Sequence, residues 1–275
     1  MIEQICSMAL TNAHHEGRVA FTWGHLVDAM TAVESGTAVG VQYTELEARA
    51  TAIHEAGHAA AAHVYRPQLE SSRLSIRMRG SSLGHHQSFE KEERFSNFQS
   101  ELFGDLVHGL GAMAAEHVFY GENTEGVGGD LQNATSKAAV MVGAAGMAPA
   151  PLDLAPVKLD DESEEQARER IAKRFEQIGL RLMNRTRGSA DFHADPIAAV
   201  LQDPYKRAAA AQLMGQAFVI AHNLIRLNKA AVEKIADAVV EEKEIFGDEL
   251  VRLLDSVALK KPEIDFEQDE TWPRM

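Results

Sequence analysis

The run His54-Glu55-Ala56-Gly57-His58 carries residue types and a spacing that could do chemistry. Residues four apart lie on one face of an α-helix, so His54 and His58 can present ring nitrogens to a single metal ion. Zinc accepts neutral imidazole, and its catalytic sites combine three protein ligands with one water. Zinc lowers the pKa of that water towards about 7, and Glu55 would lie beside it, able to take its proton as the water attacks a carbonyl. The motif therefore predicts metal-assisted hydrolysis of an amide, with Glu55 as the general base.

A solvated helix face that carries histidine and glutamate by chance is the alternative explanation. The chain contains 12 histidines, and such a composition produces the pattern H-E-x-x-H at odds on the order of one in twenty. The surroundings favour the metal site, because Ala59 to Ala62 follow the motif as a run too apolar for a water-facing surface. A purely structural helical protein is the weakest interpretation, and bound metal would reject it.

A long helix is predicted to carry the motif. It begins at Thr44, which forms a capping box with Glu47, continues to about Tyr65 and ends before Pro67. The same 3.6-residue period recurs along the chain and aromatic residues make up only 6%, so a mainly α protein is expected. Further helices are predicted over residues 1–34 (two helices), 98–120, 130–143, 164–184, 205–227, 229–244 and 248–257. The polar tail from Lys260 is expected to be frayed.

The best strand candidates follow the motif helix, at residues 72–90. Residues 74–78 alternate between apolar and polar, and after a turn at 79–82 the run 83–89 could pair back as a hairpin. The expected architecture is therefore a helical, zincin-like domain with a small β-hairpin or sheet beside the helix that carries the motif.

Net charge excludes some classes of partner. The chain has 275 residues and a formal net charge of −14. An acidic surface repels nucleic-acid phosphates and anionic lipids, so no nucleic-acid partner is expected. No apolar run approaches the ~20 residues that span a bilayer, and the first residues do not resemble a signal peptide. We expect no transmembrane segment in this chain and a cytoplasmic location, with a membrane-anchored parent protein as the alternative.

The single cysteine limits the chemistry of any metal site. Cys6 excludes an intrachain disulfide and a zinc site built from several thiolates, so imidazole and carboxylate must hold the metal. Cys6 itself is expected to be a small buried hydrophobic residue.

Four segments of the chain resemble, in order and spacing, the peptidase domain of the FtsH-type, ATP-dependent zinc proteases. The first is His54 to Ala59. The others are Arg79-Gly80 with Leu83-Gly84, Ala115-Glu116 with Tyr120-Gly121, and Asp130 to Thr135 followed by Met141-Val142 and Gly146-Met147. The resemblance covers residues 44–147 well and is weaker elsewhere. It implies a domain over 41–275 with a variable insertion around 150–200, preceded by a helical segment over 1–40 that resembles the end of an ATPase lid.

The resemblance also implies a set of site residues. Zn²⁺ would be held by His54, His58 and Asp130, with Glu116 orienting a ligand histidine rather than binding the metal. Leu83, Gly84 and His85 would bind substrate at the edge of the strand region. The other histidines, including His63, His86, His108 and His117, are interpreted as surface residues or satisfied core residues, although the strand that carries His86 could border the cleft.

The function expected from this resemblance is a zinc metalloendopeptidase acting on unfolded or loosely folded polypeptides through a zinc-bound water and a glutamate base. The alternative is a catalytically weak relative that serves as a scaffold or adaptor in a proteolytic assembly. The chain contains no G-x-x-x-x-G-K-[ST] run for binding ATP, so a separate ATPase partner is possible. The family further suggests a homo-oligomer in the form of a hexameric ring.

Overall fold

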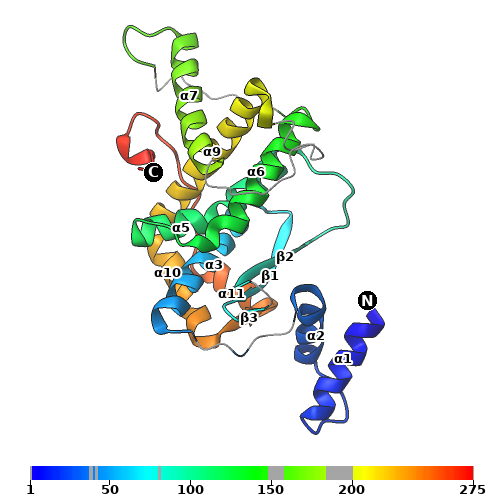
Figure 1. Cartoon of the computed structure of the whole chain (residues 1–275). Helices are drawn as coiled ribbons and strands as arrows, with labels where there is room; N and C mark the ends of the chain where they lie inside the picture. Colours follow the sequence, from blue (N-terminus) through cyan, green and yellow to red (C-terminus); the bar gives the residue numbers. More distant parts are fainter. Residues whose placement is uncertain are drawn as a thin grey trace.

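The computed structural model of the chain describes residues 2–36, 40, 43–79, 82–147, 158–183 and 201–274. This part of the chain is mainly α-helical with one small antiparallel sheet, which confirms the predicted fold class (Figure 1). The elements are α1 (Ile2–His15), α2 (Trp23–Ser35), α3 (Glu45–Tyr65), β1 (Leu69–Ser75), β2 (His85–Glu90), α4 (Gln99–Gly109), α5 (Gly111–Tyr120), η1 (Glu125–Val127), α6 (Gly128–Gly143), α7 (Glu164–Met183), α9 (Pro204–Leu227), α10 (Lys229–Glu242), β3 (Glu244–Phe246), α11 (Asp248–Ser256) and η3 (Asp269–Thr271).

The predicted motif helix is α3, and it begins as expected. The Thr44 side chain accepts from the Glu47 backbone N–H at 3.2 Å, and the Glu47 carboxylate accepts from the Thr44 N–H at 2.9 Å. Every residue from Thr51 to Ala62 except His54 is buried. Helices α4, α5 and α10 and strand β1 all pack against α3, so the motif lies in the middle of the core rather than on a solvated face.

Two glycines allow α5 to approach α3 closely. A Cβ at Gly57 would lie 2.6 Å from the Gly111 carbonyl oxygen, and a Cβ at Gly111 would lie 2.7 Å from the Gly57 carbonyl oxygen. No side chain fits at such distances, so the backbones of the two helices touch here. The glycine inside the H-E-x-x-H motif therefore serves the packing of α5, the helix that carries Glu116.

The helical pattern predicted over residues 98–120 is divided in the structure into two helices. α4 ends at Gly109 and α5 begins at Gly111, with Leu110 between them at φ −93° and ψ −2°. Leu106, Leu110 and Met113 are all fully buried, so the apolar period continues through the break and gives no sign of it. The break frees carbonyl groups at the end of α4 from their helical partners.

The predicted hairpin exists, with different bounds. β1 spans Leu69–Ser75 and pairs antiparallel with β2, with a register shift between Ser71 and Arg73. Residues 76–78, expected in the first strand, lie beyond its end. β3 pairs with the other side of β1, which gives the order β2-β1-β3 and leaves β2 as an edge strand. A three-residue strand such as β3 is too short to show a period of two.

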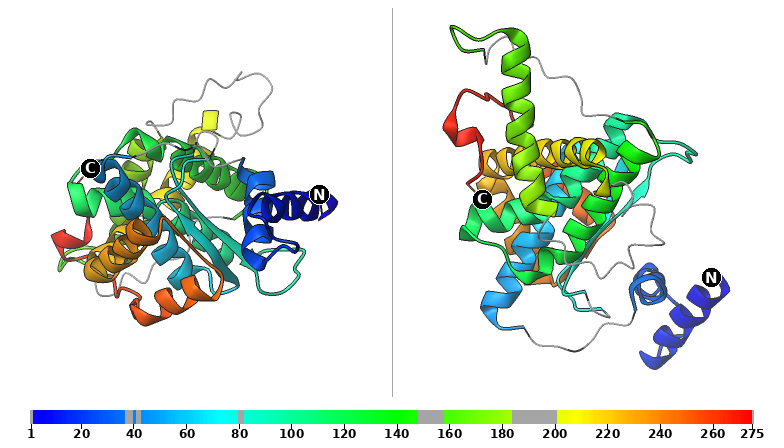
Figure 2. Two further views of the ribbon diagram at one scale, coloured as in Figure 1. Left: turned by 90° about the horizontal axis from the view of Figure 1, so that it is seen from below. Right: turned by 45° about the horizontal axis from the view of Figure 1, so that its top comes forward.

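One helix among the described residues, α9, is long and apolar enough to cross a membrane by length and composition alone. The expectation that no apolar run approaches that length is therefore wrong. An 18-residue window of α9 has a mean hydropathy of 1.2, and 78% of that window is buried inside the protein. Helices α4, α5, α6 and α7 pack against α9, which lies beside α7 in both views of Figure 2.

The predicted insertion over 150–200 lies partly outside the described residues, and its variable nature stays a prediction. Its described part includes α7, whose Ala167, Ile171 and Phe175 are buried against α9. This segment therefore contributes to the core.

The C-terminal tail is ordered rather than frayed, contrary to prediction. Trp272 is 5% exposed, and the Arg174 guanidinium of α7 stacks over its ring at 3.8 Å. The Asn223 side chain of α9 donates to the Thr271 carbonyl at 2.8 Å. A polar composition hides these contacts, because the few residues that anchor the tail are spread along it.

The N-terminal segment forms two helices, as predicted. α1 and α2 pack on each other, and α2 lies on the side nearer the strands in Figure 1. Arg73 of β1 donates to the Val27 carbonyl of α2 at 3.4 Å. Cys6 is exposed on α1, so its predicted burial is wrong. The likeness of this segment to an ATPase lid stays a prediction.

Candidate metal centre and active site

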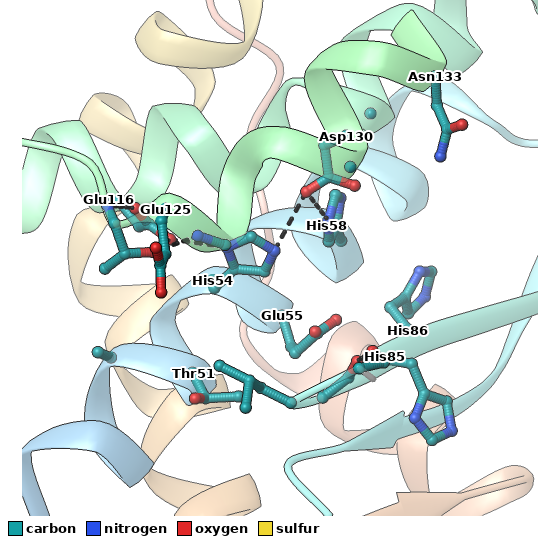
Figure 3. A pocket seen from close by; sticks show the side chains of 18 of the residues that line it. Thr51, His54, Glu55, His58, His85, His86, Glu116, Glu125, Asp130 and Asn133 are labelled. Atoms are coloured by element: carbon teal, nitrogen blue, oxygen red, sulfur yellow. Dashed lines mark hydrogen bonds and ion pairs between the residues drawn. The ribbon is translucent and has the colours of Figure 1, made fainter. Parts of the chain in front are cut away.

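Three side chains from two helices converge on one point. His54 and His58 project from α3, and Asp130 lies in the first turn of α6 (Figure 3). Asp130 Oδ2 lies 3.2 Å from His54 Nε2 and 3.3 Å from His58 Nε2. The ligand atoms of the three residues lie within 4.8 Å of one another, and they form the single such group found among the described residues.

His54 is oriented by a buried carboxylate. Its Nδ1 donates to Glu116 Oε1 at 2.7 Å, and Glu116 is 1% exposed. Glu116 is itself held by Thr124, whose backbone N–H donates to Oε2 at 2.6 Å and whose hydroxyl donates to Oε1 at 3.0 Å. The Nε2 of His54 is left facing Asp130. This position suits the orienting role predicted for Glu116.

His58 is oriented by a backbone group. Its Nδ1 donates to the carbonyl oxygen of His108 at 2.9 Å. That carbonyl is available because α4 ends one residue later, at Gly109, and the next helix begins at Gly111. The break in the predicted helix thus supplies a partner to a candidate ligand. Any residue type carries a carbonyl, so the sequence holds no signal for this contact.

Charge is shared within the cluster. Burial alone would lower the pKa of His54, but hydrogen bonds to Asp130 and Glu116 raise it to about 10. The pKa of His58 is also raised, against its burial, by the charge of Asp130. Burial would raise the pKa of Asp130, yet the charge of His58 and hydrogen bonds to both rings lower it. The cluster is therefore arranged to hold positive charge, which a divalent cation would supply in place of protons.

The donor set fits zinc. Two imidazole nitrogens and one carboxylate oxygen are typical of a catalytic zinc site with three protein ligands. Both rings are fixed through Nδ1 and present Nε2, and in many metal sites such outer partners fix the ring and the tautomer. Thiolates are absent from the group, in line with the single cysteine.

Glu55 lies beside this cluster. It is 4% exposed, and burial raises its pKa, while the positive charge of His54 and His58 and a backbone hydrogen bond from His86 act in the opposite direction. Figure 3 shows its carboxylate between the ligand histidines and His86. A buried carboxylate with a raised pKa is suited to taking up and releasing a proton.

The cluster opens into a cavity of about 940 Å³. The predicted substrate-binding residues Leu83, Gly84 and His85 all line it. The Leu83 carbonyl accepts from the Tyr43 hydroxyl at 2.7 Å. In Figure 3 the His85 ring points away from Glu55, and both of its nitrogens are buried without a hydrogen-bond partner among the described residues.

Comparison with known proteins identifies the family. A model of peptidase family M41 matches residues 41–253, which include every candidate site residue. The chain belongs to peptidase family M41. This confirms the resemblance to the FtsH-type peptidase domain.

Several curated relatives of this M41 chain are named as FtsH zinc metalloproteases. It is 26% identical over 219 residues to "ATP-dependent zinc metalloprotease FtsH 3" of Symbiobacterium thermophilum, covering 80% of this chain and 31% of the relative. It is 28% identical over 255 residues to "ATP-dependent zinc metalloprotease FtsH" of Thermotoga maritima, covering 92% and 38%. It is 26% identical over 245 residues to "ATP-dependent zinc metalloprotease FTSH 6, chloroplastic" of Arabidopsis thaliana, covering 88% of this chain and 32% of the relative. The chain spans about a third of the length of these relatives.

Two histidines of the M41 chain were assigned no role from sequence, yet they line the cavity. His86 and His108 lie next to each other, with His86 Nδ1 3.2 Å from His108 Nε2. They come from β2 and α4, and nothing in their local sequence indicates that the two elements meet. The alternation of a strand was the one available signal, since it places His85 and His86 on opposite faces.

Gly84 is placed so that a side chain would disturb Glu55. A Cβ there would lie 2.7 Å from the Ser75 carbonyl oxygen, 2.8 Å from Thr51 Cγ2 and 2.9 Å from Glu55 Cγ. We expect Gly84→Ala to lower peptide cleavage by about 10- to 100-fold, because small displacements of catalytic groups have effects of this size. Zinc content should be unchanged. Gly128→Ala is the control, since its Cβ would meet open space, and equal activity of the two variants would refute the prediction.

Proposed function

We propose that this chain is a zinc metalloendopeptidase, with Zn²⁺ held by His54, His58 and Asp130. The observation that carries the proposal is the convergence of these three side chains beside the buried carboxylate of Glu55 in one cavity. The names of the relatives support Zn²⁺ as the metal. When bound, the ion supplies Lewis acidity, which polarises a carbonyl and lowers the pKa of water.

Glu55 acts as the general base in this proposal. It takes a proton from the attacking water while the water oxygen bonds to the carbonyl carbon of the peptide. The same proton then passes to the amine nitrogen as the C–N bond breaks. His54 and His58 keep fixed orientations through this step because Glu116 and the His108 carbonyl hold their Nδ1 atoms.

The substrate we propose is an extended polypeptide. β2 is an edge strand whose residues His85 and His86 line the cavity, so a peptide paired with that edge would run past Glu55. Pairing of this kind reads backbone groups and leaves side-chain choice to pockets. Leu83 and Gly84, just before β2, would contact the same segment.

Folded proteins should resist the chain acting alone. Unfolding a stable domain costs about 5–15 kcal/mol, and the chain contains no ATP-binding G-x-x-x-x-G-K-[ST] run. We therefore expect cleavage of unstructured polypeptides only, at a rate that ATP does not change. Digestion of a stable folded domain beside its unfolded variant, each with and without ATP, measures this. Digestion of the stable domain without ATP would contradict the substrate proposal.

Assembly follows from the family as a further part of the proposal. The relatives are named ATP-dependent, so we propose that a separate or attached ATPase feeds polypeptide to this site, and that the chain assembles as a hexameric ring. Light scattering tests the ring, and a strict monomer under all conditions would remove it.

Metal analysis combined with a peptide-cleavage assay tests the proposed function. About one zinc per chain together with cleavage would support it. Much less than one zinc per chain after resupply would remove the metal centre. Full zinc without turnover of any peptide would favour the alternative, a scaffold or adaptor in a proteolytic assembly.

A further inference from the structure

A chain of three hydrogen-bonding side chains ends at the candidate active site. The Ser71 hydroxyl of β1 lies 2.8 Å from His86 Nε2, and His86 Nδ1 lies 3.2 Å from His108 Nε2. Ser71 is 8% exposed, so this series of hydrogen bonds begins inside the protein. It runs from the sheet to α4. The His108 ring lies 5.0 Å from the ring of His58, measured between centroids. The chain therefore ends one imidazole away from a candidate metal ligand.

The last nitrogen of this chain is open to the cavity. His108 lines the cavity, and its Nδ1 has no hydrogen-bond partner among the described residues. Unlike both nitrogens of His85, which are buried without a partner, His108 Nδ1 is not fully buried. His108 Nδ1 is therefore accessible from the cavity, whereas both nitrogens of His86 are engaged.

The direction of the hydrogen bonds from Ser71 through His86 decides whether His108 Nδ1 donates or accepts. Burial disfavours the charged form of both rings, and of the two facing nitrogens, His86 Nδ1 and His108 Nε2, one must donate and the other accept. A neutral imidazole has one N–H and one acceptor nitrogen. If the Ser71 hydroxyl donates to His86, then His86 donates to His108, and His108 Nδ1 carries a hydrogen. If His108 donates to His86 and His86 donates to Ser71, His108 Nδ1 is an acceptor. The net charge is the same in both directions.

We propose that His108 binds the substrate backbone through Nδ1, next to the bond that is cut, and that His86 and Ser71 are positioning residues that hold its ring. A peptide offers both a carbonyl and an N–H, so either direction of the chain gives a complementary hydrogen bond. No proton leaves the chain in this role. The inference deepens the proposed peptidase function and rests on it.

The test uses the zinc-loaded protein and a fluorogenic peptide, with kcat/KM as the readout. His108→Leu removes Nδ1 and should lower kcat/KM by about 3- to 10-fold, the usual effect of one neutral hydrogen bond. His108→Asn places an amide atom near the position of Nδ1 and should retain most activity, whereas His108→Gln places it near Nε2 and should behave like Leu. The backbone carbonyl that holds His58 remains in all three variants, so zinc content should not change. Wild-type activity in His108→Leu, or equal loss in Asn and Leu, would overturn the proposal.

Ser71 gives a second test, whose single variants leave His108 itself unchanged. Ser71→Ala removes the hydrogen bond to His86 and should lower kcat/KM about 2- to 5-fold. Ser71→Thr keeps the hydroxyl and should restore the wild-type kcat/KM. In the His108→Leu background, Ser71→Ala should have no further effect, because a positioning residue acts only through the ring it holds. Additive losses would overturn the proposed connection. Wild-type protein that holds zinc but cleaves no peptide would remove the proposed function as well, whereas an active wild type with unchanged variants would overturn this inference alone.

Discussion

Glu55→Gln is expected to lower kcat/KM for peptide cleavage by about 100-fold or more while the zinc content stays at the wild-type level. The amide keeps the shape of the side chain but takes no proton from water. Glu55 contributes no atom to the group formed by His54, His58 and Asp130, so metal binding should be preserved. Cleavage is measured with a fluorogenic peptide, and zinc by elemental analysis of the same sample.

A control for charge lies in the same cavity. Glu125 lines the cavity and is exposed, and Glu125→Gln makes the same chemical change without touching the proposed base. It should leave kcat/KM within about 2-fold of wild type, since exposed charges interact weakly with their surroundings. Retained activity in Glu55→Gln would assign the base to another residue.

The loss of zinc affinity on substitution should distinguish the proposed ligand Asp130 from the proposed orienting residue Glu116. Asp130→Ala removes one of three ligands and should weaken zinc binding more than Glu116→Gln, for which a loss of about 10- to 100-fold is expected from an outer carboxylate. The reason is visible in the contacts, because Asp130 faces Nε2 of both histidines and Glu116 faces only Nδ1 of His54. Competition against a chelator of known affinity measures both constants.

The relative size of the two losses in zinc affinity shows which residue is the ligand and which only orients a ring. Equal losses would mean that Glu116 does more than orient a ring. A larger loss in Glu116→Gln would place Asp130 outside the ligand set. Asp130→Asn is a useful third variant, since it keeps the side-chain volume and removes only the negative charge of the ligand.

Local sequence information was sufficient for α3 and its motif. The Thr44–Glu47 capping box and a period of 3.6 act over a few residues, and these interactions appear in the structure. The break at Leu110 could not be seen in the same way, because buried residues on both sides continue one apolar pattern. β3 pairs with β1 across most of the chain length, and three residues carry no period that would reveal such a partner.

The site was predicted in unequal parts. Spacing alone indicated His54 and His58, whereas Asp130 and Glu116 came from a family resemblance, since no local rule connects α6 or α5 to the motif. Their roles as ligand and orienting residue stay predictions, although the structure brings both into contact with His54. The partnership of His86 and His108 depends on where α4 meets the sheet, which is a property of tertiary packing.

The edge strand β2 also bears on solubility. An open strand edge can pair with a strand of another copy, and repeated pairing of this kind leads to aggregation. β2 has six residues, and its outer end runs directly into exposed Glu90, Lys91 and Glu92. Charged side chains at that point oppose the extension of a continuous ladder between copies. The edge is thus too short and too charged at its end to form a continuous sheet between many copies.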